Sequence, residues 1–431
     1  MDLLTLIESE TNLHEKQILI DEITTKASVF AAEIDTDDIA SVKFATTLLS
    51  SGIPKSSERD EEREYEPEDF PCIPETASSA LVCAAAVVKH SRSLLNNRKC
   101  VVPLSVLCYA HLNPTLPWSN ETSVSKSNEL LKLIKFTESS STFAVKIITY
   151  IQAHLRRDTW KKHPCYRHIF KAALIEVRLP NLFNYINLIL PPALLFVDDY
   201  MMHNQLLGLT CIKHIVSNVA PTELEWQGRR EVIYDALKHL MYIREAPIID
   251  ALYDCFHQFF FSTDIQSCSL LKANGEREFH MKSEEVFREM LRGAEVEQRI
   301  VIREAYSAHL APFILGIGIK VLKYMQTTLS VVLEYINVYD TPRQMCRRNS
   351  LVALEALVKV AWPRMSSHFD EIVKALFRLA YDLEDRSCTE LDDELRSCLT
   401  ILKAACPKEH EHFVEHLYGL KERNIPGVNR L

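Results

Sequence analysis

Apolar helical faces alternate with proline-marked turns along most of this 431-residue chain. The stretch from Leu190 to Val219 shows the pattern best. Pro191-Pro192 predict a helix stop, Asp198-Asp199-Tyr200 predict an acidic turn, and a helix follows. With a repeat of 3.6 residues, one face of that helix carries Gly208, Cys211, Ile212, Ile215, Val216 and Val219. Glycine costs a helix about 1 kcal/mol against alanine, so we expect Gly208 to allow the close approach of a neighbouring helix.

The same alternation continues on both sides of that stretch. It predicts helices near residues 77–90, 101–111, 127–136, 143–155 and 248–261. Three further apolar stripes run over 322–336, 351–361 and 372–379. Prolines are expected to mark helix ends or first turns, namely Pro164, Pro180, Pro191, Pro221, Pro247, Pro312, Pro342, Pro363 and Pro407. Asp340 or Thr341 is expected to cap the helix that Pro342 begins. The polar residues 263–281 predict a surface loop.

Composition changes sharply once, at residues 52–76, which are acidic, contain proline and hold few apolar residues. We interpret them as a linker or disordered loop between N-terminal helices (1–51) and a helical array (77–425), with a frayed tail at 426–431. The alternative is an acidic docking segment, in which Ser57 with Asp60 suits an acidophilic kinase.

Glycine is scarce, with 9 residues where a usual share of about 7% would give about 30. Sheets use glycine at turns and bulges, and nucleotide folds use it in phosphate loops. The shortage therefore predicts an all-α fold. Helical pairs every 35–45 residues favour an α-solenoid of degenerate HEAT-like repeats, in which each pair covers the apolar face of the next. A compact helical bundle is the alternative.

Net charge and cysteine usage limit the partners and the cellular compartment that we expect for this protein. The net charge is −9 and basic residues occur in isolated pairs, so we expect no nucleic-acid partner. The 12 cysteines contain no CxxC pair, and Cys83, Cys108, Cys211 and Cys255 fall on apolar faces, which suits a reducing compartment. The N-terminus lacks the features of a signal peptide, and the apolar run 188–197 is too short to span a bilayer. We therefore expect a soluble cytoplasmic or nuclear protein with no membrane partner.

Four segments in order carry a resemblance to a known family. LPPALLFVDDY with LLGLTCIKHIVSNV lies at its centre, preceded by KHPCYRHIFKAALIEV and followed by DALKHLMYIREAPIIDAL and YINVYDTPRQMCRRNSLVALEALVKVAWPR. Together they span about residues 160–385 and are similar to the Tel-two-interacting protein two (Tti-two) family, a subunit of the TTT cochaperone complex. The remaining residues add little to the likeness.

The resemblance implies an α-solenoid with no catalytic centre and no cofactor. It implies direct binding to the Tti-one subunit, which in turn holds Tel-two. It also implies that the complex helps phosphatidylinositol-kinase-related kinases of the mTOR, ATM and ATR type mature with the ninety-kilodalton heat-shock chaperone.

Two histidine patterns could hold zinc. His412 and His416 form H-x-x-E-H, in which two histidines one helical turn apart share a metal and the glutamate acts as base. A third ligand is required, and His410 faces another side, so an exposed charged helix is the plainer interpretation. His163, Cys165 and His168 also have a spacing faintly like that of metal ligands. We assign no catalytic, cofactor-binding or metal residue.

Partner-binding candidates lie at the turns. They are Asp198, Asp199, Tyr200, Tyr339, Asp340, Trp362, Pro363 and Arg364. Tryptophan and arginine are enriched where proteins bind partners, but helix capping and turn anchoring explain the same residues. Asp198-Asp199 could also be a catalytic pair, although no nearby histidine or lysine is arranged as its complementary acid or base.

The leading hypothesis is a non-enzymatic scaffold. One rival is a different solenoid adaptor, such as a transport receptor or a phosphatase scaffold. The other is a metal-dependent enzyme that uses His412 and His416.

Overall fold

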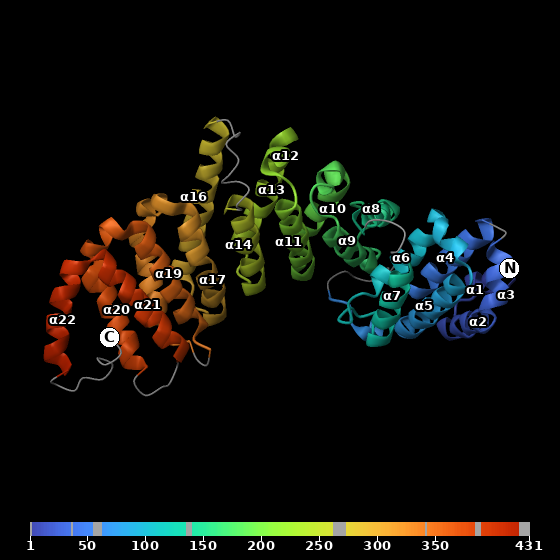
Figure 1. The fold of residues 1–431 in the computed structure, drawn as a ribbon, viewed down its shortest axis with the longest axis horizontal. Helices are drawn as coiled ribbons and strands as arrows, with labels where there is room; N and C mark the ends of the chain where they lie inside the picture. The colour runs from blue at the N-terminus through green and yellow to red at the C-terminus, as the bar shows by residue number, and fades with distance from the viewer. Residues whose placement is uncertain are drawn as a thin grey trace. The chain divides into compact units, whose positions relative to one another are not determined.

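The structure is a computed structural model that describes residues 2–35, 38–54, 63–134, 140–261, 273–340, 343–383 and 389–421. These residues form α-helices and short 3-10 helices joined by turns, and none of them forms a strand (Figure 1). The all-α prediction is thereby confirmed. The chain divides into two compact units, Met1–Val219 and Ala220–Leu431.

Unit 1 is built from stacked helical pairs. Its helices are α1 (Asp2–Ser9), α2 (Leu13–Thr25), α3 (Ala27–Asp35), α4 (Asp38–Gly52), α5 (Ile73–His90), α6 (Arg98–Ala110), α7 (Glu121–Ile134), α8 (Ser140–Ile151), α9 (Pro164–Glu176), α10 (Ile186–Val197) and α11 (Met202–Ser217). Helices α4, α6, α9 and α11 follow one another in one layer, each in contact with the next. Helices α5, α7, α8 and α10 pack on that layer, so each pair covers apolar surface of its neighbours.

Unit 2 follows the same plan. Its helices are α12 (Pro221–Glu225), α13 (Arg229–Lys238), α14 (Ala246–Phe261), α16 (Ala273–Val296), α17 (Ile300–Ile317), α18 (Met325–Asn337), α19 (Met345–Ala361), α20 (Phe369–Asp382), α21 (Thr389–Ala405) and α22 (Pro407–Lys421). Helices α14, α17, α19 and α21 form the first layer, each touching the next. Helices α16, α18 and α20 form the second layer in the same way. This stacking of pairs confirms the α-solenoid prediction.

Gly208 lies where α11 meets α10, and all the apolar-face residues predicted for α11 are buried. A Cβ atom at Gly208 would lie 2.5 Å from the backbone nitrogen of Val197 and 2.9 Å from the carbonyl carbon of Phe196. Such separations are far below van der Waals contact, so only glycine lets the two backbones approach this closely. The expected role of Gly208 is confirmed.

The proline predictions are partly wrong. Pro164, Pro221 and Pro407 begin helices as expected. Pro191 and Pro192, however, lie inside α10, and Pro312 lies inside α17. An interior proline costs a helix about 3 kcal/mol. Both helices bury most of their length against neighbours, and this packing offsets the local penalty.

The polar segments also need correction. Residues 63–76 of the predicted linker are described, and much of this segment is packed on the fold. Phe70 is buried edge-on against Trp118, and α5 already begins at Ile73. Residues 273–281 of the predicted surface loop belong to α16. Residues 55–62, 262–272 and 422–431 lie outside the described residues, and the frayed tail predicted for 426–431 is among them.

One stretch, Ile300–Asn337, is long and apolar enough to cross a membrane by length and composition. It is two α-helices, α17 and α18, joined through Gly318 at φ 63° and the 3-10 helix Gly318–Tyr324. Helix α17 packs on α14 and α19, and α18 packs on α16, α19 and α20. We therefore interpret the stretch as part of the core of unit 2.

We predict that Gly208→Ala destabilises the protein by about 1–3 kcal/mol, because the added methyl group overpacks the contact with Val197. Urea unfolding followed by circular dichroism measures the loss. Thr210→Ala is the matched control, since Thr210 is exposed on the same helix and should change stability by less than about 0.5 kcal/mol. Equal stabilities of the two variants would contradict the proposed close packing.

Candidate partner-binding surfaces

The structure places the predicted partner residues at three separate turns. Asp198, Asp199 and Tyr200 precede α11 in unit 1. In unit 2, Tyr339 and Asp340 precede α19, whereas Trp362, Pro363 and Arg364 follow it in the 3-10 helix Trp362–His368. Helix α19 is 17 residues long, so about 25 Å separates its two ends. The two turns of unit 2 therefore lie on opposite edges of the unit and do not form one site.

Asp199 is a buried structural carboxylate. Lys161 Nζ lies 2.8 Å from its Oδ1, and Asn204 Nδ2 donates a hydrogen bond of 2.5 Å to its Oδ2. Burial alone would raise the pKa of Asp199, but the hydrogen bonds from Lys161 and Asn204 outweigh it and hold the pKa below its ordinary value. The sequence argument missed Lys161 because it lies on a different part of the chain. The side chain of Asp199 serves the fold and is not open to a partner.

Asp340 is buried as well. Its Oδ2 accepts hydrogen bonds from the backbone N–H groups of Cys346, at 2.6 Å, and Arg347, at 3.3 Å. Asp340 therefore caps a helix, as predicted, but that helix begins at Met345 and not at Pro342, which lies outside the described residues. Gln344, the residue directly before the helix, adopts the left-handed conformation with a φ of 51°.

The exposed members of the predicted set remain candidates for contact with a partner. Trp362 is 60% exposed and Tyr200 is 62% exposed, and Tyr339 is exposed beside Asp340. Lys161 Nζ lies 4.7 Å from the ring centre of Tyr200, and the guanidinium of Arg347 lies 5.5 Å from that of Tyr339. A cation is attracted to the face of an aromatic ring, and this attraction favours the observed position of each tyrosine on the surface.

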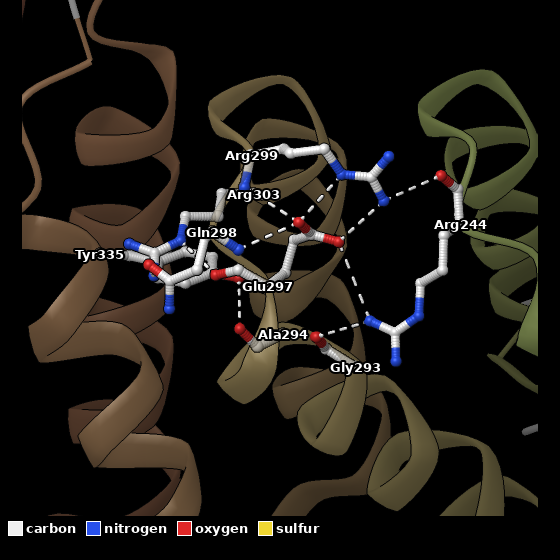
Figure 2. Close-up of polar contacts among 8 residues, drawn as sticks. All are labelled: Arg244, Gly293, Ala294, Glu297, Gln298, Arg299, Arg303 and Tyr335. Atoms are coloured by element: carbon white, nitrogen blue, oxygen red, sulfur yellow. Dashed lines mark hydrogen bonds and ion pairs between the residues drawn. The ribbon is translucent and has the colours of Figure 1, made fainter.

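Sequence reasoning missed a polar cluster around Glu297, in the turn between α16 and α17 (Figure 2). The carboxylate accepts hydrogen bonds from the backbone N–H groups of Gln298, at 3.0 Å, and Arg299, at 2.9 Å. Arg299 also donates from Nε, at 3.2 Å, and Nη2, at 3.3 Å. The Arg299 side chain is the main cause that lowers the pKa of Glu297 to about 2, with the backbone donors adding to it against the opposing effect of burial.

Arg303 extends this cluster to the next helical pair. Its Nε donates to the carbonyl oxygen of Glu297 at 2.6 Å (Figure 2). Its Nη2 donates to Glu334 at 2.6 Å. The guanidinium lies 5.1 Å from the ring centre of Tyr335, whose hydroxyl donates to the carbonyl oxygen of Ala294 at 2.8 Å. Helices α16, α17 and α18 are thereby joined at one edge of unit 2.

Arg244 brings the turn before α14 into the same cluster. Its Nη1 donates to the carbonyl oxygen of Gly293, at 3.3 Å, and lies 3.9 Å from the Glu297 carboxylate. Arg299 Nη2 in turn donates to the carbonyl oxygen of Arg244 at 3.3 Å. These polar contacts tie three successive pairs together at this edge.

Asp199, Glu297 and Asp340 occupy equivalent places in the fold. Each lies in the turn before a first-layer helix, respectively α11, α17 and α19, and each accepts hydrogen bonds from that turn or helix. The sequence does carry a signal for the two in unit 2. An acidic residue precedes a buried arginine by six positions in Glu297–Arg303 and by seven in Asp340–Arg347.

The two histidine patterns are assigned no metal. Among the described side chains, no group of three or more His, Cys, Asp and Glu is placed to hold an ion. Burial raises the pKa of the Cys165 thiol to about 12 and lowers the pKa of His168 to about 3. The His168 ring instead packs edge-on against Trp118. His412 is exposed beside Glu415 on α22, while the side chain of His416 lies outside the described residues.

Solved structures with a similar fold are found by comparison. No family model matches the chain. Kap95p, in a structure of its binding to RanGDP, is similar over 96% of this chain and 48% of its own, with a TM-score of 0.57 and 13% identity. Yeast importin-beta (Kap95p) is similar over 83% of this chain and 44% of its own, with a TM-score of 0.56 and 13% identity. At such low identity the likeness concerns the fold alone.

The fold and its turn networks define an α-solenoid of the HEAT-repeat class. TELO2-interacting protein 2 of Mus musculus is 31% identical over 282 residues, which are 62% of this chain and 54% of that protein. The protein of the same name from Homo sapiens is 29% identical over 281 residues, covering 62% and 55%. The chain is thus similar to proteins of the TELO2-interacting protein 2 family, as the sequence resemblance indicated. It spans about half the length of the curated relatives it matches.

We predict a pH-dependent loss of stability for Glu297→Gln. The pKa of Glu297 in the folded chain, about 2, lies below the ordinary value of about 4.3, so the ionised form stabilises the fold above about pH 4.3 and loses this effect as pH falls toward 2. The variant should therefore lose about 2 kcal/mol at neutral pH. Its deficit should shrink as the pH is lowered, when unfolding by urea is compared across that range.

The control for this experiment is Glu295→Gln. Glu295 is exposed two residues earlier, in the last turn of α16, so its substitution should leave the free energy of unfolding nearly unchanged. A deficit of Glu297→Gln that stays constant with pH would show that the carboxylate charge has no part in holding the turn.

A second prediction concerns the buried Arg347, whose side chain is 1% exposed and whose Nη2 lies 2.6 Å from Oδ2 of Asp382, which is 43% exposed. Asp382→Ala leaves a buried guanidinium without its carboxylate and should cost about 2–3 kcal/mol. Adding Arg347→Met removes that charge, so the double variant should be more stable than Asp382→Ala alone. Thermal unfolding of the three proteins checks the order, and a less stable double variant would contradict it.

Proposed function

We propose that this protein is a non-enzymatic scaffold subunit of a TTT-type complex, which binds a Tti-one solenoid directly and Tel-two through it. The observation that carries the proposal is the 31% identity to TELO2-interacting protein 2 over 282 residues. Proteins of that name are named for an interaction with TELO2. Because the chain spans about half of such a relative, the assignment of partners is part of the proposal.

The surface of each unit suits a scaffold. Exposed aromatic side chains at the turns, such as Tyr200 and Trp362, resemble the anchors that dominate protein interfaces. The turns at Asp199, Glu297 and Asp340 are held by charge-assisted hydrogen bonds. A turn that is already ordered loses little conformational entropy on binding, which favours affinity. A stable interface of about 1,600 Å² would need several such anchors.

The wider role follows from the family resemblance. We propose that the complex supports the maturation of phosphatidylinositol-kinase-related kinases together with the ninety-kilodalton heat-shock chaperone, in the cytoplasm or the nucleus. Of the ten cysteines among the described residues, nine are buried, which supports a reducing compartment.

The rival functions have weaker support. The likeness to karyopherins concerns fold alone, because the identity is 13%. The enzyme hypothesis rested on His412 and His416, and the described partner of His412 is Glu415 at 3.7 Å on an exposed helix surface. Neither observation favours transport or catalysis over a scaffold.

We predict that Trp362→Ala lowers the recovery of this protein with a co-expressed Tti-one subunit by about tenfold or more, because a large exposed aromatic anchor contributes about 2 kcal/mol or more to binding. Tyr200→Ala and Tyr339→Ala test the other two turns in the same way. Affinity purification followed by size-exclusion chromatography measures the recovery, and unfolding curves confirm that each variant is folded.

Trp226→Ala is the matched control, since Trp226 is 65% exposed in unit 2 but lies outside the predicted partner residues. Failure of the unmodified chain to co-purify with Tti-one would overturn the proposed complex. Binding that survives all three test substitutions would instead reject these turns as the contact surface.

A further inference from the structure

An apolar trough crosses the first layer of unit 2 between α14 and α19, with α17 as its floor. Its volume is about 560 Å³. Most of its lining is apolar, from Phe261 of α14, Ala308, Ala311, Pro312 and Leu315 of α17, and Val352 of α19, and the polar residues His257, Ser307 and Asn349 also line it. All of these residues belong to one compact unit. None of them is among the turn residues considered above.

The trough exists because α17 carries small residues between two taller neighbours. Ala308 and Ala311 leave space that larger side chains would fill, and Pro312 adds no donor to the floor. At one end the Phe261 ring closes over Gly316, where a Cβ atom would lie 2.5 Å from the ring. Leu315 is 56% exposed within the lining, so part of the apolar surface of the trough is open to solvent.

Charge around the trough is unbalanced. The two nearby basic side chains on α19 are each paired, Arg348 with Glu394 at 3.7 Å and Lys359 with Glu355 at 3.2 Å.

Helical spacing places two acidic residues, Asp254 of α14 and Glu304 of α17, on the same helix faces as lining residues of the trough. Glu304 precedes Ala308 by one helical turn, and Asp254 precedes Phe261 by two. Asp250, one turn further along α14, is hydrogen-bonded to His309 at 2.9 Å. The apolar trough therefore has an acidic flank at one end.

We propose that this trough binds an amphipathic helix of another protein, with apolar side chains in the trough and lysine or arginine against Asp254 and Glu304. The proposal is independent of the TTT assignment, because it rests on the shape and charge of unit 2 alone. A single patch that combines apolar lining with an acidic flank selects a partner of this composition by charge complementarity.

The dimensions fit such a helix. From Ser307 to Gly316 the floor extends about 14 Å along α17. Apolar side chains at positions i, i+3, i+4 and i+7 of a helix cover about 10 Å, so one amphipathic face fills the trough. Asp254 and Glu304 each lie about one turn before a lining residue, His257 and Ser307 respectively. This is within reach of a long basic side chain on the next turn of the bound helix.

The test uses a display library of peptides about 16 residues long, with apolar residues at i, i+3, i+4 and i+7 and random flanks, selected on the full chain. Enriched peptides should carry lysine or arginine in one flank. A selected peptide, labelled with a fluorophore, is then titrated with variants of the protein and compared with a twin whose basic residues are replaced by glutamate.

Leu315→Glu should lower the affinity for the selected peptide by about tenfold or more, because the substitution places a charge in the apolar trough. Leu6→Glu is the matched control, since Leu6 is 52% exposed on α1 in unit 1, and it should change affinity by less than about twofold. The double variant Asp254→Lys/Glu304→Lys should prefer the glutamate twin.

Three results would overturn the proposal: no enrichment of peptides, enrichment of acidic flanks, or binding that Leu315→Glu leaves unchanged. Leu315 is more than half exposed, so its substitution should leave the chain folded, and unfolding curves verify this.

Discussion

A helical pair in this protein carries apolar surface on more sides than its own two helices can cover, and every other feature depends on this excess. Helix α17 shows it plainly, because it packs on α14, α16 and α19 and buries Ile302, Phe313 and Ile314 among them. The next pair along the chain must cover what remains. Burial at about 25 cal/mol per Å² makes this the dominant favourable term, and it imposes a solenoid on a chain whose pairs are unlike one another.

Stacking has a consequence for the turns. When successive pairs approach closely, the backbone donors at the start of each first-layer helix are removed from water, and each needs an acceptor. Asp340 supplies it for α19 and Glu297 supplies it for the turn into α17. Arginines then neutralise or bridge the carboxylates, as Arg299 and Arg303 do. The result is an ordered edge on which exposed aromatic side chains such as Tyr339 are held in place.

The two kinds of surface on unit 2 differ in physical character. The turn edge is stiff and polar underneath, with isolated aromatic side chains exposed, and it suits contact with another folded surface. The trough over α17 is apolar and bordered by acidic residues on one side, and it suits an inserted helix. A solenoid can carry both because its layers expose different helix faces along one repeat, so one scaffold can serve more than one partner.

The sequence alone determined the helical class, the buried face of α11, the role of Gly208 and the family likeness, because each depends on local periodicity or on runs of residues that are contiguous in the chain. Helix ends were less predictable. Pro191 and Pro312 predict breaks by local energetics, yet packing on neighbouring helices keeps α10 and α17 continuous.

Tertiary structure also decided which acidic residues are buried. Asp199 pairs with Lys161, which lies 38 positions earlier in the chain, and Arg347 pairs with Asp382, which lies 35 positions later. No local sequence pattern therefore predicts either ion pair. The trough is likewise a product of three helices, since Ala308 and Leu315 form part of a surface only after α14 and α19 are placed beside α17. Local propensity is read along the chain, whereas burial and charge pairing are properties of neighbours that only folding brings together.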